Sequence, residues 1–242
     1  MQILACTDKG RLREKNEDFF AYDTLDDNNA YMILCDGMGG RTGGEIASHC
    51  AVDSIVASFK RSLVKNLPSN TIRHLLESVS VTANQAVYDL SDSDAELKGM
   101  GTTLVTAIIS GNNLHIAHAG DSRAYLIRGN DIIQLTVDHS VVQTLIDKGE
   151  LTTEQAKVHP RKNIITRALG VYDNIDIDLN EASLLKDDII ILCSDGLSNC
   201  VSSPEMVEIF KNNEFDQAVP LLIGKANDAG GPDNITVVAA KI

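Results

Sequence analysis

The sequence predicts an α+β fold in which two antiparallel sheets pack face to face with helices outside them. Three observations support this prediction: expected strands outnumber expected helices, the helices occur in two pairs, and a run of strands is joined by short turns. The 242 residues contain no linker, low-complexity segment or repeat of fixed period. We therefore expect a single domain over residues 1–242.

The first half of the chain is expected to contain two strands and then two helices. Residues 2–7 and 30–35 are short apolar runs of the kind that form buried strands. Apolar residues then recur at helical spacing from residue 44 to about 63, and again from about 70 to 90.

The middle of the chain has the pattern of an antiparallel meander. Glycine-containing turns separate four successive apolar stretches. The expected strands are residues 101–110, 113–119, 122–128 and 131–135.

The last part of the chain begins with a polar segment and ends with helices and a strand. The polar segment, residues 139–165, contains two short helical pieces at about 139–148 and 152–157. Strands are expected near 175–179 and 188–193, helices at about 204–211 and 215–228, and a final strand at 234–241.

The composition excludes several classes of protein. The formal net charge of −13 disfavours a nucleic-acid partner, since such binding needs a basic face. No apolar run approaches the roughly 18 residues of a membrane helix, and the first residues lack the apolar segment of a signal peptide. The five cysteines are odd in number and have no metal-binding spacing. We therefore expect reduced cysteines in a cytoplasmic protein with no membrane partner.

Four aspartates each lie where an apolar run gives way to glycine or another small turn residue, namely Asp36, Asp121, Asp195 and Asp233. Carboxylates gathered from several strand ends would repel one another unless a cation lay between them. An all-oxygen donor set suits Mg2+ or Mn2+ better than zinc. A single Asp-Gly pair is typical of a plain turn, but the repeated pattern favours a metal site. The small residue Gly37 would let its backbone carbonyl approach a metal.

Two further features point to phosphate chemistry. A basic segment at residues 11–15 precedes Glu17 and Asp18. Such a run is usually a charged surface turn, but an arginine beside an acidic metal cluster would bind two phosphate oxygens. The residues from Cys35 to Thr42 also spell the C-x5-R-T loop of cysteine-dependent phosphatases. Asp36 beside Cys35 disfavours a thiolate there, and that mechanism leaves the other aspartates unexplained.

Two of the six histidines border the polar segment and are candidates for proton transfer, His139 and His159. We expect the other four to be structural because they lie in helices or a strand. These four are His49, His74, His115 and His118.

The chain resembles the metal-dependent protein serine/threonine phosphatases of the PP2C (PPM) family, in the compact bacterial form. The matching segments occur in family order, cover nearly the whole chain and are together highly specific. They are TDKGRLREKNED (7–18), DGMGG (36–40), MGTT (100–103), AHAGDSR (117–123), DHS (138–140), NIITRALG (163–170), LCSDGL (192–197) and GGPDNITV (230–237).

This resemblance implies a four-layer αββα sandwich with a metal cleft at one end of two antiparallel sheets, each covered by a pair of helices. It implies that Asp36 bridges two Mn2+ or Mg2+ ions and that the carbonyl of Gly37 binds one of them. Asp195 and Asp233 would complete the pair, and Asp121 with Asp195 would hold a third ion.

The resemblance also assigns roles around the metals. Asp18 matches an acidic residue close to the metals that often acts through water, and Arg13 matches the phosphate-binding arginine. Residues 140–165 correspond to a flap subdomain that influences substrate choice.

The chain departs from the family pattern at the proton donor. Eukaryotic members carry histidine where Met38 stands, and many bacterial members carry histidine where Arg41 stands. The candidates for protonating the leaving group are therefore His159 and a metal-bound water.

We expect the chain to hydrolyse phosphoserine and phosphothreonine on proteins. Two cations about 3.5–4 Å apart would hold a bridging water and lower its pKa towards neutrality. Arg13 and the metals would offset the charge on the phosphoryl oxygens. The resemblance implies that the partners are phosphorylated proteins, including a serine/threonine kinase and its substrates, and a monomer is expected. Two alternatives stay open, a metal-bound phosphoprotein sensor without turnover and a Cys35-dependent phosphatase.

Overall fold

The computed structural model describes residues 1–39, 43–63, 65 and 67–242 of the chain. The strands of the first sheet are β1 (Gln2–Asp8), β7 (Arg123–Arg128), β8 (Asp131–Gln134), β10 (Ile189–Cys193) and β11 (Ile235–Lys241). Those of the second sheet are β2 (Asp18–Asp26), β3 (Asn29–Met38), β4 (Gly101–Thr102), β5 (Leu104–Ser110), β6 (Asn113–Ala119) and β9 (Asp178–Ser183). The helices are α1 (Gly43–Ser62), α2 (Ser69–Ser93), α3 (Val141–Asp147), α4 (Thr153–Lys157), α5 (Asp195–Ser198), α6 (Ser203–Asn212) and α7 (Phe215–Asp228).

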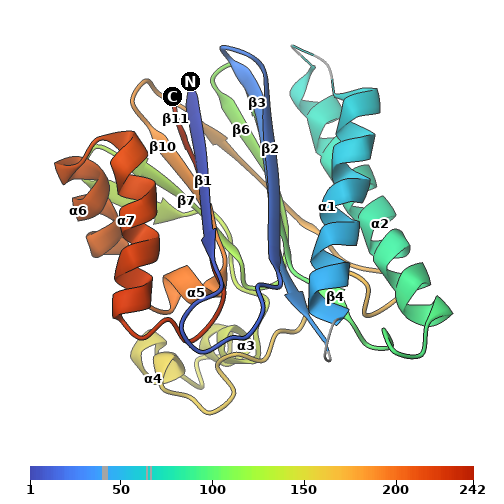
Figure 1. Cartoon of the computed structure of the whole chain (residues 1–242). Helices are drawn as coiled ribbons and strands as arrows, with labels where there is room; N and C mark the ends of the chain where they lie inside the picture. The colour runs from blue at the N-terminus through green and yellow to red at the C-terminus, as the bar shows by residue number, and fades with distance from the viewer. Residues whose placement is uncertain (40–42, 64, 66) are drawn as a thin grey trace.

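The elements form four layers, as the sequence predicted. The first sheet has the strand order β1-β11-β10-β7-β8, and the second has the order β2-β3-β5-β6-β9 with β4 paired to β3. Every pairing is antiparallel. Figure 1 shows the two sheets side by side, with α1 and α2 outside the second sheet and α6 and α7 outside the first.

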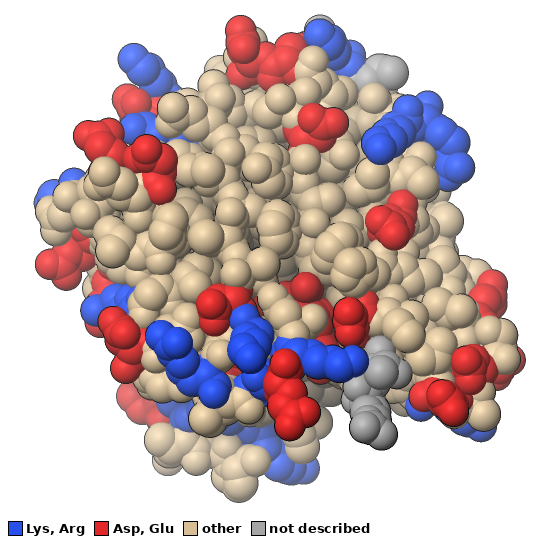
Figure 2. All heavy atoms as spheres, in the orientation of Figure 1, with Lys and Arg blue, Asp and Glu red and all other residues tan. Residues whose placement is uncertain are grey.

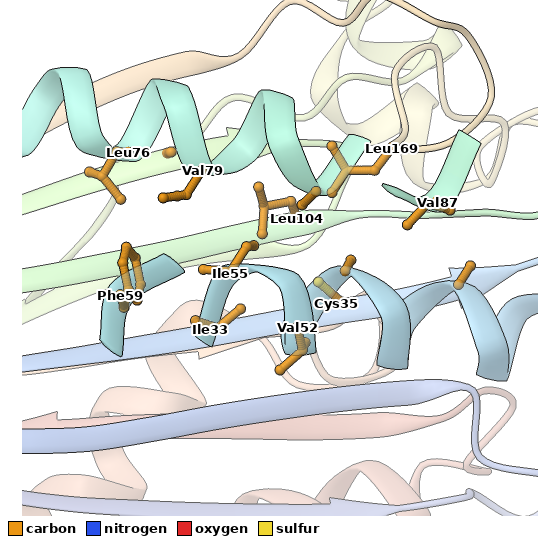
Figure 3. Packing of buried hydrophobic residues seen from close by; sticks show 14 of the residues in the cluster. Ile33, Cys35, Val52, Ile55, Phe59, Leu76, Val79, Val87, Leu104 and Leu169 are labelled. Carbon is orange, nitrogen blue, oxygen red and sulfur yellow. The ribbon is translucent and has the colours of Figure 1, made fainter. Parts of the chain in front are cut away.

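Three apolar clusters hold the layers together. One lies between the second sheet and helices α1 and α2, where Ile33 of β3 packs with Ile55 and Phe59 of α1 and Leu76 of α2 (Figure 3). A second joins the first sheet to α6 and α7. The third lies between the sheets. A chain of this length therefore buries apolar surface at each of its three layer boundaries, which is the main force that stabilises the fold.

The sequence of β3 is apolar without alternation because both faces of the strand are buried. Ile33 and Cys35 face the helices, whereas Met32 and Leu34 face the other sheet. Both faces of the strand are thus covered, and neither needs polar residues. This central position makes β3 a rigid support for Asp36, which lies near its end.

The structure corrects several element boundaries. Strand β2 was not predicted, because it is an edge strand whose exposed or half-exposed residues include Asp23 and Asp26, so it lacks a strong apolar signal. The short helix α5 was not predicted either. The expected strand near 175–179 is β9, which begins at Asp178, and the expected strand 101–110 is divided at Thr103 into β4 and β5. Asp36 and Gly37 lie inside β3 rather than in a turn after it.

The loops that carry the candidate site lie at one end of the sheets. In Figure 1 the chain termini are at the top, whereas α3, α4, α5 and the loop after β1 are at the bottom. All five cysteines are free thiols, with Cys35 and Cys193 buried. None of the helices that the structure describes has the length and apolar character needed to cross a membrane.

Candidate metal centre

Five aspartates reach one end of the molecule from both sheets. Asp18 begins β2 and is the direct cross-strand partner of Asp36 on β3. Asp121 follows β6, Asp195 is the first residue of α5 after β10, and Asp233 precedes β11. Residues directly opposite each other in an antiparallel pair point to the same face, so Asp18 and Asp36 share a face of the second sheet.

The effect of neighbouring carboxylates on the pKa of Asp36 indicates that these aspartates lie near one another. Burial raises the pKa of Asp36 well above its usual value, and the negative charges of Asp18, Asp195, Asp121 and Asp233 raise it further. Burial also raises the pKa values of Asp121 and Asp195, each of which is raised further by a neighbouring carboxylate. Carboxylates that repel one another in a buried site are stabilised by a cation among them.

Asp18 is held in place by the other sheet. Its Oδ2 atom accepts hydrogen bonds of 2.6 Å from the hydroxyl of Thr236 and 2.8 Å from that of Ser194. Its other oxygen, Oδ1, is buried and has no hydrogen-bond partner among the described residues. A buried oxygen without a partner is costly unless it contacts a water molecule or an ion. Asp18 therefore has one oxygen fixed by the protein and one left for a ligand.

Arg13 lies beside the aspartates. Its guanidinium donates a hydrogen bond of 2.7 Å to Oδ2 of Asp233, and the Arg13 side chain is 49% exposed. Figure 2 shows basic and acidic side chains gathered on the lower part of the molecule, the end that carries the loop after β1. An exposed guanidinium next to half-buried carboxylates is in a suitable place to contact an incoming phosphate.

Asn234 fixes the loop that carries Arg13. Its side-chain amide donates to the backbone carbonyls of Lys9 and Lys15, at 2.9 and 2.8 Å. Its side-chain oxygen accepts from the backbone N–H of Glu17, at 2.8 Å. These contacts fall on both sides of the basic segment, so one buried amide sets the position of Arg13 relative to Asp233.

The backbone around Asp36 is fixed by two threonines. The hydroxyl of Thr103 accepts a hydrogen bond of 2.9 Å from the N–H of Asp36 and bonds the hydroxyl of Ser122 at 2.7 Å. The hydroxyl of Thr102 donates to the Asp36 carbonyl at 2.9 Å. The roles of these hydroxyl groups and of Ser194, Thr236 and Asn234 were not predicted from the sequence, although the residues lie in the segments that match the family.

Gly37 has no space for a side chain. A Cβ atom there would lie 2.0 Å from the carbonyl oxygen of Gly44 and 2.7 Å from that of Glu17. Gly37 also donates its N–H to the carbonyl of Glu17 at 3.1 Å. Glycine therefore lets three backbone segments meet next to Asp36.

The aspartates do not form a ready-made cage in this arrangement. In the part of the chain that the structure describes, no three His, Cys, Asp or Glu side chains are grouped closely enough to hold a metal ion. The effect of the other four charges on the pKa of Asp36 nevertheless indicates that they lie near it. Two of the carboxylates contact protein donors: Asp233 accepts from Arg13, and Asp195 accepts from Asn199. Metal ligation would exchange these hydrogen bonds for metal–oxygen bonds.

The sequence prediction that His159 is a proton donor gains no support from its contacts. His159 lies after α4, where its Nδ1 atom accepts a hydrogen bond from the backbone N–H of Arg161 at 3.1 Å. Among the described residues no hydrogen bond or ion pair joins His159 to any of the five aspartates. Met38 ends β3, and Arg41 lies outside the described residues.

The cysteine alternative is disfavoured by the position of Cys35. This residue is fully buried in β3, and burial raises the pKa of its thiol, with the charge of Asp36 acting in the same direction. A nucleophilic cysteine needs the opposite shift. Arg41 and Thr42, the other fixed residues of that motif, lie outside the described residues.

Comparisons with known proteins agree with this geometry. The family model for protein phosphatase 2C matches residues 11–219. The serine/threonine phosphatase stp of Listeria monocytogenes serotype 4b is 41% identical over 233 residues, which cover 96% of this chain and 92% of that protein. Protein phosphatase PhpP of Streptococcus pneumoniae D39 is 38% identical, and the match covers 98% of this chain and 96% of that protein.

Solved structures of serine/threonine phosphatases have the same fold as this chain. The serine/threonine phosphatase of S. agalactiae superposes with a TM-score of 0.93 at 36% identity, and the match covers 100% of this chain and 99% of that one. The catalytic domain of the phosphatase PstP in complex with two manganese ions superposes with a TM-score of 0.85 at 34% identity, covering 99% and 97%. The family match, the relatives and the shared αββα fold together establish that the chain belongs to the protein phosphatase 2C family.

Proposed function

We propose that this chain hydrolyses phosphoserine and phosphothreonine side chains of proteins, with Mn2+ or Mg2+ as cofactor. The observation that carries the proposal is the group of five aspartates at one end of the two sheets, in which the charges of the other four raise the pKa of Asp36. Hydrolysis of a phosphate ester at such a site needs no covalent enzyme intermediate. The family relatives are named serine/threonine phosphatases, which supports the substrate class.

The residues present fit a pair of hard cations, with Asp121 and Asp195 available for a third. The available donors are carboxylate and backbone oxygens, and Oδ1 of Asp18 is buried with no hydrogen-bond partner in the described ranges. Asp36, the carbonyl of Gly37, Asp195 and Asp233 would hold the two ions. Bound cations of this type lower the pKa of a water molecule towards neutrality and offset charge on a phosphoryl group.

The protein's own groups would position the substrate. Arg13 would bind two phosphate oxygens through its planar guanidinium, which its exposure permits. Asn234 would keep the Arg13 loop in place, so that phosphate binding costs little ordering of the backbone. The candidates for protonating the leaving serine or threonine oxygen remain His159 and a water on the metal.

The remaining parts of the proposal concern organisation and partners. Residues 1–242 would form a single catalytic domain with a flap subdomain at about 140–165. An isolated bridge between Ser140 and Ile165, at the two ends of that segment, supports this division. The protein would act as a cytoplasmic monomer on phosphorylated proteins, including a serine/threonine kinase and its substrates.

Peptide hydrolysis tests the proposal. Phosphate release is measured from a phosphothreonine peptide and from the same peptide with phosphotyrosine, in Mn2+ and in chelator. We expect Mn2+-dependent release from the phosphothreonine peptide and much slower release from the other. Arg13→Ala should raise KM more than it lowers kcat, whereas Arg73→Ala, an exposed change on α2, should alter neither.

Three outcomes would contradict the proposal. Binding of Mn2+ and phosphopeptide without phosphate release would indicate a sensor. Hydrolysis that persists in chelator and is lost in Cys35→Ser would indicate the cysteine mechanism. A KM unchanged by Arg13→Ala would remove Arg13 from the site.

A further inference from the structure

His139 uses both of its ring nitrogens inside the protein. Its Nδ1 atom accepts a hydrogen bond of 3.1 Å from the backbone N–H of Gly120. Its Nε2 atom lies 3.1 Å from Oδ2 of Asp178. The residue is only 8% exposed. Neither nitrogen is left to exchange a proton with a substrate, so the expected role of His139 in proton transfer gains no support from these contacts.

The two contacts fix the tautomer of the ring. Because the N–H of Gly120 is a donor, Nδ1 must be the unprotonated nitrogen, and the proton of the neutral imidazole is on Nε2. Nε2–H then donates to Asp178. Arg167 lies 3.2 Å from Nε2, but its hydrogen bond goes to the other oxygen of Asp178, at 2.7 Å.

The surroundings keep the imidazole neutral. Burial lowers the pKa of His139, and the positive charge of Arg167 lowers it further, against the attraction of Asp178 and Asp138. The ring of His118 packs against that of His139, with the two centroids 4.7 Å apart. A neutral ring with a free lone pair on Nδ1 is the form that can accept from Gly120.

Gly120 has a backbone conformation that favours glycine. Its φ angle is +116°, and a Cβ atom there would lie 2.7 Å from the side chain of Thr103. A second hydrogen bond joins the two residues: the backbone N–H of His139 donates to the Gly120 carbonyl at 2.8 Å. His139 thus binds both polar groups of Gly120, the residue directly before Asp121.

The other side of the same loop is also held. Ser122, directly after Asp121, shares a hydrogen bond of 2.7 Å with Thr103. Asp121 therefore projects from a three-residue loop that is fixed at both neighbours. His139 also joins this loop to the base of the 140–165 segment, since its carbonyl accepts from the N–H of Thr166 at 2.8 Å.

We propose that His139 is a positioning residue for Asp121: its Nδ1 acceptor, set by Asp178, fixes the Gly120 peptide and so directs the Asp121 carboxylate to the cation cluster. This inference rests on the proposed function, because the direction of Asp121 matters to activity only if the cluster binds cations. His139 itself touches neither substrate nor metal in this account.

A pair of substitutions distinguishes the role of Nδ1 of His139 from that of Nε2. In His139→Asn the side-chain oxygen can occupy the place of Nδ1 and still accept from Gly120. In His139→Gln the polar group reaches the place of Nε2, and Gly120 loses its acceptor. Mn2+ binding to the metal-stripped proteins is measured by titration calorimetry, together with Mn2+-dependent hydrolysis of p-nitrophenyl phosphate and the Tm of each variant in chelator.

The two variants should differ in their affinity for Mn2+. His139→Gln should weaken the Asp121-dependent Mn2+ binding about 10- to 100-fold, as loss of a group that orients a ligand does. His139→Asn should stay close to the wild type. His115→Gln, a buried histidine on β6, controls for loss of a buried ring and should leave Mn2+ binding unchanged.

A double-mutant cycle tests whether the effect passes through Asp121. In an Asp121→Ala background, His139→Gln should cause no further loss of Mn2+ binding. Equal losses in the Asn and Gln variants, wild-type binding in both, or losses that add to that of Asp121→Ala would each overturn the inference alone. Wild-type protein that neither binds Mn2+ nor hydrolyses the ester would overturn the proposed function as well.

Discussion

The hydroxyl of Thr236 donates a hydrogen bond of 2.6 Å to the carboxylate of Asp18. Thr236 lies in β11 of the first sheet and Asp18 begins β2 of the second, so the bond crosses the space between the sheets at the end that carries the site. Burial raises the pKa of Asp18 to about 7, while the hydrogen bonds from Thr236 and Ser194 act in the opposite direction. The two hydroxyls thus favour the ionised form of a carboxylate that lies among other carboxylates.

Removing this hydroxyl should weaken metal binding. Thr236→Val keeps the shape of the side chain but takes one donor from Asp18, and we expect a 10- to 100-fold loss of Mn2+ affinity, about the effect of losing an outer-shell partner. Calorimetric titration measures it. Thr106→Val is the matched control, because Thr106 is buried in β5 and donates to the Met32 carbonyl. Equal Mn2+ affinities in the two variants would contradict the role of Thr236.

Replacing Asp36 should raise the stability of the metal-free protein and lower its activity in Mn2+. Asp36→Asn removes a buried charge that four other carboxylates repel, so the protein in chelator should have a higher Tm than the wild type. The same change removes a carboxylate that would hold the metal ions, and it should lower kcat/KM at least ~100-fold in Mn2+. Asp53→Asn, an exposed change on α1, should alter neither quantity. Retention of most activity by Asp36→Asn would show that Asp36 is not a metal ligand.

Adding one methyl group at Gly37 should damage the site. The new Cβ would lie 2.0 Å from the Gly44 carbonyl oxygen, and we expect a loss of stability on the order of 3 kcal/mol together with loss of Mn2+ binding. Gly224→Ala provides the comparison, since Gly224 lies inside α7 and a Cβ added there would meet no atom within 4 Å. That change should raise stability by about 1 kcal/mol. Thermal unfolding measures both, and a Gly37→Ala protein as stable as the wild type would refute the packing argument.

A buried histidine should make stability depend on pH. The pKa of His118 is lowered from 6.5 to about 4, and burial is the largest cause. Its ring nitrogens have no hydrogen-bond partner in the described part of the chain, and the attraction of Asp138 and Asp178 offsets only part of the cost of charging the buried ring. Between pH 6.5 and 4 the unfolded chain binds a proton that the folded protein does not, so stability is lost as pH falls.

His118→Leu should remove this dependence. The gain in stability of the variant over the wild type should grow by about 3 kcal/mol between pH 6.5 and pH 4. Urea unfolding at several pH values in chelator measures the difference. Ile116→Val, on the same strand, should cost about 1 kcal/mol at every pH. Parallel curves for wild type and His118→Leu would show that His118 does not titrate in this range.

The sequence was a good guide to the fold wherever burial was complete. The apolar run of β3 and the helical spacing of α1 predicted those elements because each is covered by other layers. Strand β2 was missed because an edge strand with partly exposed residues has a mixed composition. The same segment supplies Asp18, whose position opposite Asp36 depends on strand pairing that no local pattern reveals.

The sequence was a weaker guide to how the site is held. Residue types and family resemblance indicated the aspartates and Arg13, because carboxylates and guanidinium groups have recognisable chemistry. Thr103 and Asn234 gave no such signal, since their roles depend on residues that are far away in the chain. His139 was a candidate for proton transfer, yet its tautomer depends on Gly120 and Asp178, which only the folded structure brings together.

The central claim is that hydrolysis depends on a metal that the aspartates would hold. The most direct test is hydrolysis of p-nitrophenyl phosphate by metal-stripped protein, before and after Mn2+ is added back. The account predicts no activity in chelator, recovery with Mn2+, and no recovery in Asp36→Asn. Activity that is indifferent to metal and abolished by thiol alkylation would contradict it and favour Cys35, and binding of Mn2+ without any turnover would contradict it in favour of a sensor.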